Sequence, residues 1–235
     1  TATEVETAVV NMYDGLQGVN STSAGDNHPT QVELYLTEMR SDNTRTKAQE
    51  GEAAQFESFA VEATNGIVAD YYRSFYNVIF RANLVLANLE AAGTSAAQFE
   101  AEAKFVRAYA YFNLVRLYGD IPLVTSLTGP ADTDLAYTRV ASDDVYDLIQ
   151  ADLNTAISGL DNTYRTRASK AGAQALLAKV ELTRGNYGEA RSLLESVVAT
   201  GNYSLESNFH DVFYDEDNSE TIFSIGYETG GIDSQ

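Results

Sequence analysis

The fold of this chain is decided by residues 77–125, NVIFRANLVLANLEAAGTSAAQFEAEAKFVRAYAYFNLVRLYGDIPLVT. Two apolar segments with helical spacing meet there at a Gly-Thr-Ser turn. The second segment runs into Tyr118-Gly-Asp-Ile-Pro122, where glycine stops a helix and proline restricts the backbone that follows. Its apolar residues lie on nearly every side, which is typical of a central, buried helix. The stretch therefore predicts a helical hairpin at the core of the molecule.

The same periodicity predicts further helices on both sides of this hairpin. The first begins at a capping box formed by Thr3 and Glu6, and Gly15 and Gly18 mark its end. The next helix after the hairpin begins at Ser142, which we expect to act as its N-cap. The expected helices are 67–89, the one ending at Tyr118, 142–160, 168–184 and 187–200. Residues 18–30 and 119–140 are expected to be connections, 31–63 a surface loop with some helix, and 221–225 a strand or extended segment.

Residues 171–202 have the spacing of a tetratricopeptide helix pair, although the tryptophan of that repeat is missing. Residues 70–92 with 96–118, and 142–160 with 168–184, repeat the helical hairpin without clear sequence identity. We therefore predict a mainly α fold, a tetratricopeptide-like stack of helix pairs with a short extended or β segment near the C-terminus. Such scaffolds usually bind other molecules and seldom catalyse reactions.

Composition narrows the classes of function. The 235 residues are 44% apolar and carry a net charge of −19, which disfavours nucleic acids and anionic headgroups as partners. No window approaches the roughly 20 apolar residues of a membrane-spanning helix. Cysteine is absent, which excludes disulfides, thiolate metal sites and thiol nucleophiles.

Motifs for catalysis, metals and cofactors are weak or missing. There is no Gly-x-Ser-x-Gly, phosphate loop or dinucleotide fingerprint, so we expect no cofactor and no enzyme activity. The two histidines, His28 and His210, lie far apart in sequence and have no matching neighbours. Asp215, Asp217 and Ser219 imitate the start of a calcium loop, but its glycine and its final glutamate are absent. A solvated acidic loop is the better interpretation, and no metal site is predicted.

The amino-acid sequence of the helical segments resembles that of the N-terminal half of SusD/RagB-type proteins. The similar segments occur in the family's order over almost the whole chain. They are Tyr13-Asp-Gly-Leu-Gln17, Ser41-Asp-Asn43, Asn77-Val-Ile-Phe-Arg-Ala-Asn83, Glu102-Ala-Lys-Phe-Val-Arg-Ala-Tyr-Ala-Tyr-Phe112, Leu117-Tyr-Gly-Asp-Ile-Pro-Leu123, Val145-Tyr-Asp-Leu-Ile-Gln-Ala-Asp152, Arg167-Ala-Ser-Lys170, Ala175-Leu-Leu-Ala178, Gly201-Asn-Tyr-Ser-Leu205 and Asn218-Ser-Glu-Thr-Ile-Phe223.

This resemblance implies a cell-surface protein of the outer membrane in Bacteroidota that binds an oligosaccharide or another oligomeric nutrient. It also implies a TonB-dependent, SusC-like transporter as partner, and a lipid anchor on an N-terminal cysteine that this sequence lacks. Residues 1–235 would then be the helical N-terminal domain, and the family's irregular C-terminal portion would be absent. The alternative is a tetratricopeptide-like scaffold that binds a peptide or protein partner.

Two sets of polar residues are candidates for separate roles. The resemblance implies that one set ties helices together; it comprises Arg81, Asn83, Glu102, Arg107 and Asp120. The predicted ligand-binding set combines short polar side chains with aromatic rings, as sugar sites do. It comprises Asp42, Asn43, Arg45, Tyr71 and Tyr72. For each residue of this second set, an ordinary structural or solvated role is the alternative.

Overall fold

The computed structural model describes residues 1–18, 29–47, 51–216 and 218–226. The expected loop at 18–30, with His28, and Asp217 therefore fall largely outside the described residues. The helices, in chain order, are α1 Ala2–Gln17, α2 Pro29–Leu36, the 3-10 helix η1 Glu38–Arg40, α3 Ala54–Glu57, α4 Gly66–Ala87, the 3-10 helix η2 Leu89–Ser95, α5 Ala96–Tyr118, α6 Thr133–Tyr137, α7 Ser142–Gly159, α8 Lys170–Thr183, α9 Tyr187–Ala199 and α10 Asp211–Tyr214.

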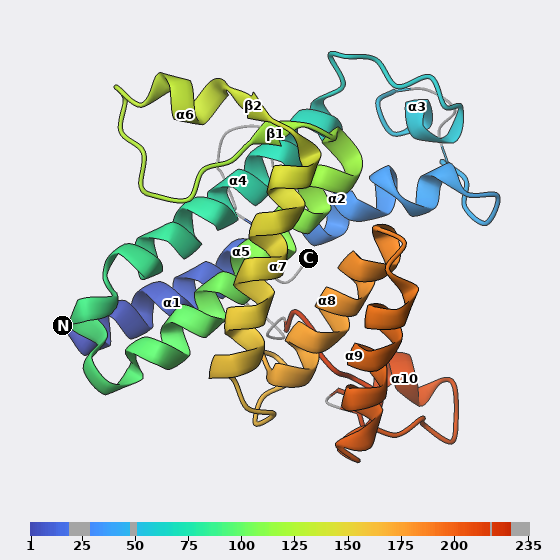
Figure 1. Cartoon of the computed structure of the whole chain (residues 1–235). Helices are drawn as coiled ribbons and strands as arrows, with labels where there is room; N and C mark the ends of the chain where they lie inside the picture. Colours follow the sequence, from blue (N-terminus) through green and yellow to red (C-terminus); the bar gives the residue numbers. More distant parts are fainter. Residues whose placement is uncertain (19–28, 48–50, 217, 227–235) are drawn as a thin grey trace.

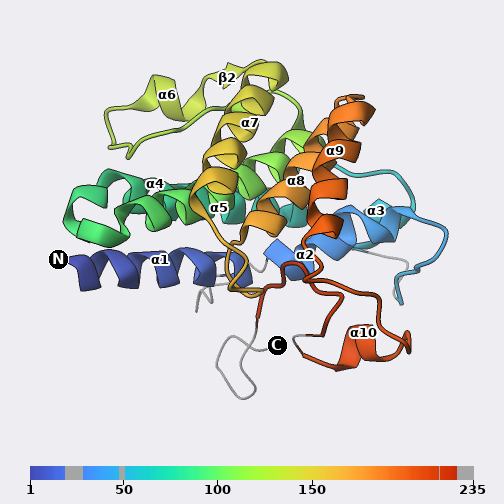
Figure 2. The ribbon, with the colours of Figure 1, turned by 60° about the horizontal axis from the view of Figure 1, so that its bottom comes forward.

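The long helices pack one upon the next (Figure 1). Helix α5 lies between α4 and α7, α7 packs on α8, and α8 packs on α9. Helix α1 runs along α4 and α5 as a further layer, as the turned view in Figure 2 shows. The predicted mainly α stack of helix pairs is confirmed.

Helix α5 is the centre of the core because it buries side chains on all sides. Its buried aromatic residues face different neighbours and include Phe99, Phe105, Tyr111 and Phe112. Each such side chain contributes roughly 1.5–3 kcal/mol when removed from water. The predicted central position of this helix is confirmed.

Two predicted helix starts are wrong. The capping box of α1 is formed by Thr1 and Glu4. Both Thr1 and Thr3 precede a glutamate by three residues, and the earlier pair adds part of a turn to the helix. Ser142 is already the first residue of α7, so its hydroxyl is not the N-cap. The Asp120 carboxylate accepts a hydrogen bond from the Ser142 backbone N–H instead, at 2.9 Å.

The segments between the long helices contain little regular structure. Strands β1, Ile121–Pro122, and β2, Arg139–Val140, form an antiparallel pair that closes the connector between α5 and α7. Residues 221–225 form no strand in the part of the chain that the structure describes, so the extended alternative applies there. Phe223 anchors this segment, because its ring packs against the ring of Phe105 with centroids 5.1 Å apart.

A buried polar network ties α4, α5 and α7 together. The Arg107 guanidinium donates to both carboxylate oxygens of Asp152, at 2.8 and 2.9 Å, and to Asn83 Oδ1 at 2.8 Å. Asn83 in turn donates to the backbone carbonyls of Val124 and Ser126. Burial raises the pKa of the Asp152 carboxyl, and the Arg107 guanidinium opposes that rise. The network holds the connector after α5 against the core.

A second network joins α1 and α5 to the segment before α8. The buried Glu102 carboxylate accepts hydrogen bonds from Arg167 at 2.8 and 2.9 Å and from the Tyr13 hydroxyl at 2.8 Å. Arg81 reaches from α4 to Asp14 on α1 at 2.8 Å. The predicted helix-tying role of Arg81, Asn83, Glu102, Arg107 and Asp120 is therefore confirmed by their contacts.

Candidate functional site

The predicted polar residues Asp42 and Asn43 lie at the tip of a tight turn that follows η1. The turn is fixed by its neighbours: the Ser41 hydroxyl accepts from the Asn43 backbone N–H at 3.2 Å, and the Thr44 hydroxyl donates to the Glu38 carbonyl at 2.6 Å. Within the described part of the chain, the side chains of Asp42 and Asn43 form no hydrogen bond or ion pair, and both are exposed. Their polar groups are therefore available to a ligand on a backbone that is already ordered.

Arg45 lies beside this turn and remains largely free. Its side chain is 81% exposed, and its Nε lies 3.6 Å from a carboxylate oxygen of Glu57. The other oxygen of Glu57 accepts from the backbone N–H and the hydroxyl of Thr46, at 2.8 and 2.7 Å. These bonds from Thr46 lower the pKa of Glu57. The two bonds from Thr46 hold this segment against α3.

An exposed aromatic ring, Phe59, follows α3. Its backbone has φ 55°, in the left-handed region that favours glycine. The Ala60 N–H donates to the Gln55 carbonyl and the Phe59 N–H to the Phe56 carbonyl, which is the Schellman pattern of a helix end. A side chain in this conformation costs roughly 1–2 kcal/mol. Phe56 is buried, whereas the Phe59 ring points outward with 68% of its surface exposed.

The segment that carries Phe59 is anchored to the start of α4. Asn65 is buried, and its side-chain amide donates to Gln55 Oε1 at 2.8 Å and to the Glu52 carbonyl at 3.0 Å. The Glu52 carboxylate accepts from the Gly66 N–H at 2.6 Å. These bonds hold the Phe59 ring on an ordered support.

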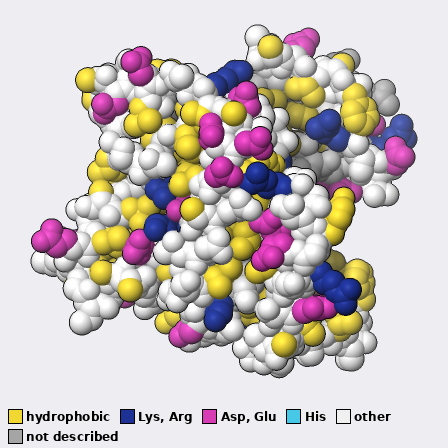
Figure 3. All heavy atoms as spheres, in the orientation of Figure 1, with side chains coloured by type: hydrophobic (Ala, Val, Ile, Leu, Met, Phe, Trp, Pro, Cys, Tyr) yellow, Lys and Arg dark blue, Asp and Glu magenta, His cyan; other side chains and the backbone are white. Residues whose placement is uncertain are grey.

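We group the turn and the ring under one name, the Phe59 face, because residues on both sides of the turn approach the α3 segment that carries Phe59. The Arg40 guanidinium lies 5.9 Å from the centroid of the Phe59 ring. Figure 3 shows Lys and Arg side chains next to hydrophobic side chains over the lobe that contains α3, at the upper right. The Phe59 face consists of Arg40, Asp42, Asn43, Arg45, Lys47 and Phe59. It contains an aromatic ring with a cation next to it, and two short polar side chains in the neighbouring turn.

The predicted aromatic partners of this turn lie elsewhere. Tyr71 is wrong as a ligand contact: its side chain is 0% exposed and packs against Phe75 in the core. Tyr72 is half-buried, and its ring contacts Tyr76 and Tyr118, with centroids 4.6 and 5.1 Å away. The structure brings together Asp42, Asn43 and Arg45 and joins neither tyrosine to them. Both tyrosines lie on the helix face that α4 buries.

Sequence reasoning did not find Phe59. A phenylalanine three residues after Phe56 in a short amphipathic segment is expected to be buried like its neighbour. Only the left-handed turn at the end of α3 directs the ring outward, and a non-glycine residue gives no signal for that conformation.

Other kinds of site have less support. Among the described residues, no group of three or more His, Asp or Glu side chains is arranged to hold a metal ion. His210 is exposed and stacks on Tyr214, with ring centroids 4.1 Å apart. No described helix is both long and apolar enough to cross a membrane.

Comparison with known proteins shows that both the sequence and the fold are similar to those of SusD-like proteins. A SusD-like family model described as "Starch-binding associating with outer membrane" matches residues 1–182. SusD-like protein P2 of Formosa agariphila is 32% identical over 188 residues, which cover 75% of this chain and 37% of that protein.

Solved structures agree with this placement. A SusD superfamily protein from Bacteroides vulgatus superposes with a TM-score of 0.81 and 24% identity, over 95% of this chain and 49% of that one. A protein named as a laminarin-binding SusD-like protein gives a TM-score of 0.79 and 28% identity, over 94% of this chain and 50% of that one. The chain thus spans about a third of the curated relative and about half of these solved chains. Because the family model matches most of its length, the chain belongs to the SusD-like family.

Proposed function

We propose that this chain binds an oligosaccharide at the cell surface through its Phe59 face. The observation that carries the proposal is the Phe59 ring, which is exposed, held by a left-handed backbone and approached by the Arg40 guanidinium at 5.9 Å from its centroid. Sugars present apolar C–H faces that stack on aromatic rings and hydroxyls that bond to short polar side chains. A laminarin-binding relative with the same fold supports a carbohydrate ligand.

The proposed activity is binding without chemistry. The ligand would be handed to a TonB-dependent, SusC-like transporter in the outer membrane, and a lipid anchor would hold the protein near that pore. The family description, which mentions association with the outer membrane, supports this location. Purification of the complex from outer membranes under mild detergent tests the partner; absence of any TonB-dependent transporter would contradict it.

Isothermal titration calorimetry tests the site. Laminarin oligosaccharides are the first probe, followed by a panel of other plant and algal oligosaccharides. We expect Phe59→Ala to weaken binding at least tenfold, because a sugar ring stacked on the Phe59 ring loses its main apolar contact when that side chain is truncated. Asn43→Ala should weaken binding less, since it removes hydrogen bonds that water partly replaces.

Tyr137→Ala is the matched control. Tyr137 is 79% exposed, somewhat more than Phe59, but lies on α6 in the connector between α5 and α7. Its loss should leave the dissociation constant unchanged. Equal effects of Phe59→Ala and Tyr137→Ala, or an unchanged affinity in Phe59→Ala, would contradict the proposed site.

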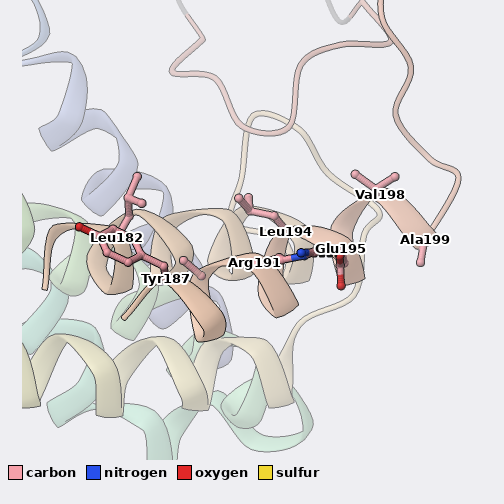
Figure 4. Close-up of a pocket in the computed structure, with 8 residues that line it drawn as sticks. Leu182, Tyr187, Arg191, Leu194, Glu195, Val198 and Ala199 are labelled. Carbon is pink, nitrogen blue, oxygen red and sulfur yellow. Dashed lines mark hydrogen bonds and ion pairs between the residues drawn. The ribbon is translucent and has the colours of Figure 1, made fainter. Parts of the chain in front are cut away.

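A second candidate function, binding of a peptide partner, is favoured by an apolar groove along α9 (Figure 4). Leu182, Tyr187, Leu194 and Val198 are all exposed there, and the last three recur at helical spacing. Such a stripe suits an amphipathic helix that lays its own apolar side chains against it. Titration with amphipathic helical peptides tests this function: it requires binding that Leu194→Asp abolishes and Phe59→Ala does not.

A further inference from the structure

The Phe59 face differs in charge from the rest of the chain. Residues 40–47 contain three cations, Arg40, Arg45 and Lys47, and one carboxylate, Asp42. The whole chain has 15 basic and 34 acidic residues. Residues 40–47 are therefore a basic stretch within an acidic chain, and the roles of their three cations decide what this stretch can bind.

These cations are not used to hold the fold. Arg40 and Lys47 have no carboxylate within ion-pair distance among the described residues, and Arg45 makes only the 3.6 Å contact to Glu57. By contrast, Arg107 and Arg167 are each bound to a buried carboxylate by two hydrogen bonds.

The acidic neighbours of the face are already occupied by other donors. Glu57 accepts two hydrogen bonds from Thr46, Glu52 accepts from the Gly66 N–H, and Glu38 accepts from the Ser41 hydroxyl. Their charges are therefore partly satisfied by local dipoles. Among the described residues, Arg40, Lys47 and Asp42 are the charged groups of the face without an ion pair, and Arg45 makes one long contact to Glu57.

We propose that the Phe59 face selects an oligosaccharide that carries acidic groups, with a sugar ring stacked on Phe59 and its carboxylate or sulfate bound by Arg40 and Arg45. This inference rests on the proposed function. Guanidinium groups bind planar or tetrahedral oxyanions through paired N–H donors, which gives them a stronger preference for such groups than for neutral hydroxyls.

The overall charge of −19 fits a short ligand better than a polyanion. Repulsion from distant carboxylates is largely screened beyond about 8–10 Å at physiological ionic strength, whereas a direct contact is not. A nucleic acid would extend many charges across the acidic surface, while an oligosaccharide with a few acidic groups would contact the face alone.

The test uses ligands that differ only in charge. Hexamers of galacturonate and of a sulfated galactan are titrated beside their carboxyl-reduced and desulfated counterparts, with laminarihexaose as a neutral glucan. We expect at least one acidic hexamer to bind at least tenfold more tightly than its neutral counterpart. The two acidic probes distinguish carboxylate from sulfate recognition.

Variants separate this inference from the proposed function. Arg40→Gln/Arg45→Gln should weaken binding of the acidic hexamer at least tenfold, so that it binds no more tightly than its neutral counterpart. Arg73→Gln, on an exposed arginine paired with Asp70, is the control. Thermal melts establish that each variant is folded. Tighter binding of the neutral hexamer, with no effect of the double variant, would overturn the charge preference and leave sugar binding intact. No binding to any sugar would overturn both.

Discussion

Arg107 and Asp152 form a two-point ion pair whose side chains are only 6% and 3% exposed. The pair joins α5 to α7, the two helices at the centre of the stack. Removing two charges from water is costly, and the additional bond from Arg107 to Asn83 offsets part of that cost. The pair therefore fixes how the two helices meet more than it adds to stability.

Loss of one partner should be severe. Arg107→Met leaves the Asp152 carboxylate buried and unpaired, so we expect the free energy of unfolding to fall by about 3–5 kcal/mol. Arg107→Met/Asp152→Leu should recover most of that loss, because no charge is then buried. Urea unfolding at pH 7 measures both. Arg191→Met is the control, since the exposed pair of Arg191 with Glu195 should contribute less than about 1 kcal/mol. Equal losses in the two single variants would contradict this view of the buried pair.

The sequence predicted the stack of helices well, because the apolar periodicity of long helices survives in any context. It also identified Arg107 and Glu102 as residues that tie helices together, although their partners far along the chain were not evident. The first residue of a helix was harder to predict, since Thr1 and Thr3 each precede a glutamate by three residues and so have the same capping pattern. At the start of α7 the Asp120 carboxylate, and not the predicted Ser142 hydroxyl, accepts a hydrogen bond from a backbone N–H. The tertiary fold brings the turn after α5 to that helix end, which the local sequence does not show.

The candidate site was only half predictable. Asp42, Asn43 and Arg45 lie in one polar turn and are neighbours in sequence, so composition alone indicated them. The aromatic component depends on which face each residue presents. Tyr71 follows the buried stripe of α4, while Phe59 is exposed by a left-handed backbone at the end of α3. The periodicity of α4 could have excluded Tyr71 as a ligand contact. No pattern in the sequence indicates that the Phe59 ring is exposed.

Phe59 should show a conflict between stability and binding. Glycine adopts a positive φ without steric cost, so Phe59→Gly should raise the free energy of unfolding by about 1 kcal/mol while it abolishes sugar binding. Urea unfolding and calorimetry on the same sample measure the two effects. Phe56→Gly is the contrasting variant, since it removes a buried ring and should destabilise the protein by about 3–5 kcal/mol. A destabilised Phe59→Gly would show that the ring supports the fold.

Two buried tyrosines should respond oppositely to loss of the hydroxyl. The Tyr71 hydroxyl is buried with no hydrogen-bond partner among the described residues. The Tyr111 hydroxyl donates to the Val124 carbonyl at 2.9 Å and accepts from the Val124 N–H at 2.7 Å. We expect Tyr71→Phe to raise the free energy of unfolding by about 1 kcal/mol and Tyr111→Phe to lower it by a similar amount. Destabilisation by Tyr71→Phe would indicate a partner for its hydroxyl.

Stability should fall steeply at high pH. Burial raises the pKa of Tyr71, Tyr76, Tyr111 and Tyr118 well above the ordinary value near 10. Above pH 10 the unfolded chain loses these protons and the folded chain keeps them, so ionisation favours unfolding. The contribution is fully present below pH 10 and is lost as the pH rises further. Absorbance of tyrosinate and circular dichroism, followed together, should show the exposed tyrosines ionising first and the buried ones only with loss of helix. Complete ionisation before any unfolding would contradict this order.

The contact of α7 with α5 depends on the lack of a side chain at Gly159. A Cβ there would lie 2.8 Å from the Cβ of Ala101, closer than packed carbons approach, so Gly159→Ala must separate the two helices. We expect it to lower the free energy of unfolding by about 1–3 kcal/mol. Gly188→Ala, in the first turn of α9 with open space around it, should raise it by about 0.5 kcal/mol because alanine favours helix. Ala101→Gly should rescue part of the loss in Gly159→Ala, although alone it costs about 1 kcal/mol. Urea unfolding of the three single variants and the double variant gives the coupling free energy between the positions; strictly additive effects would show that the helices do not meet at this point.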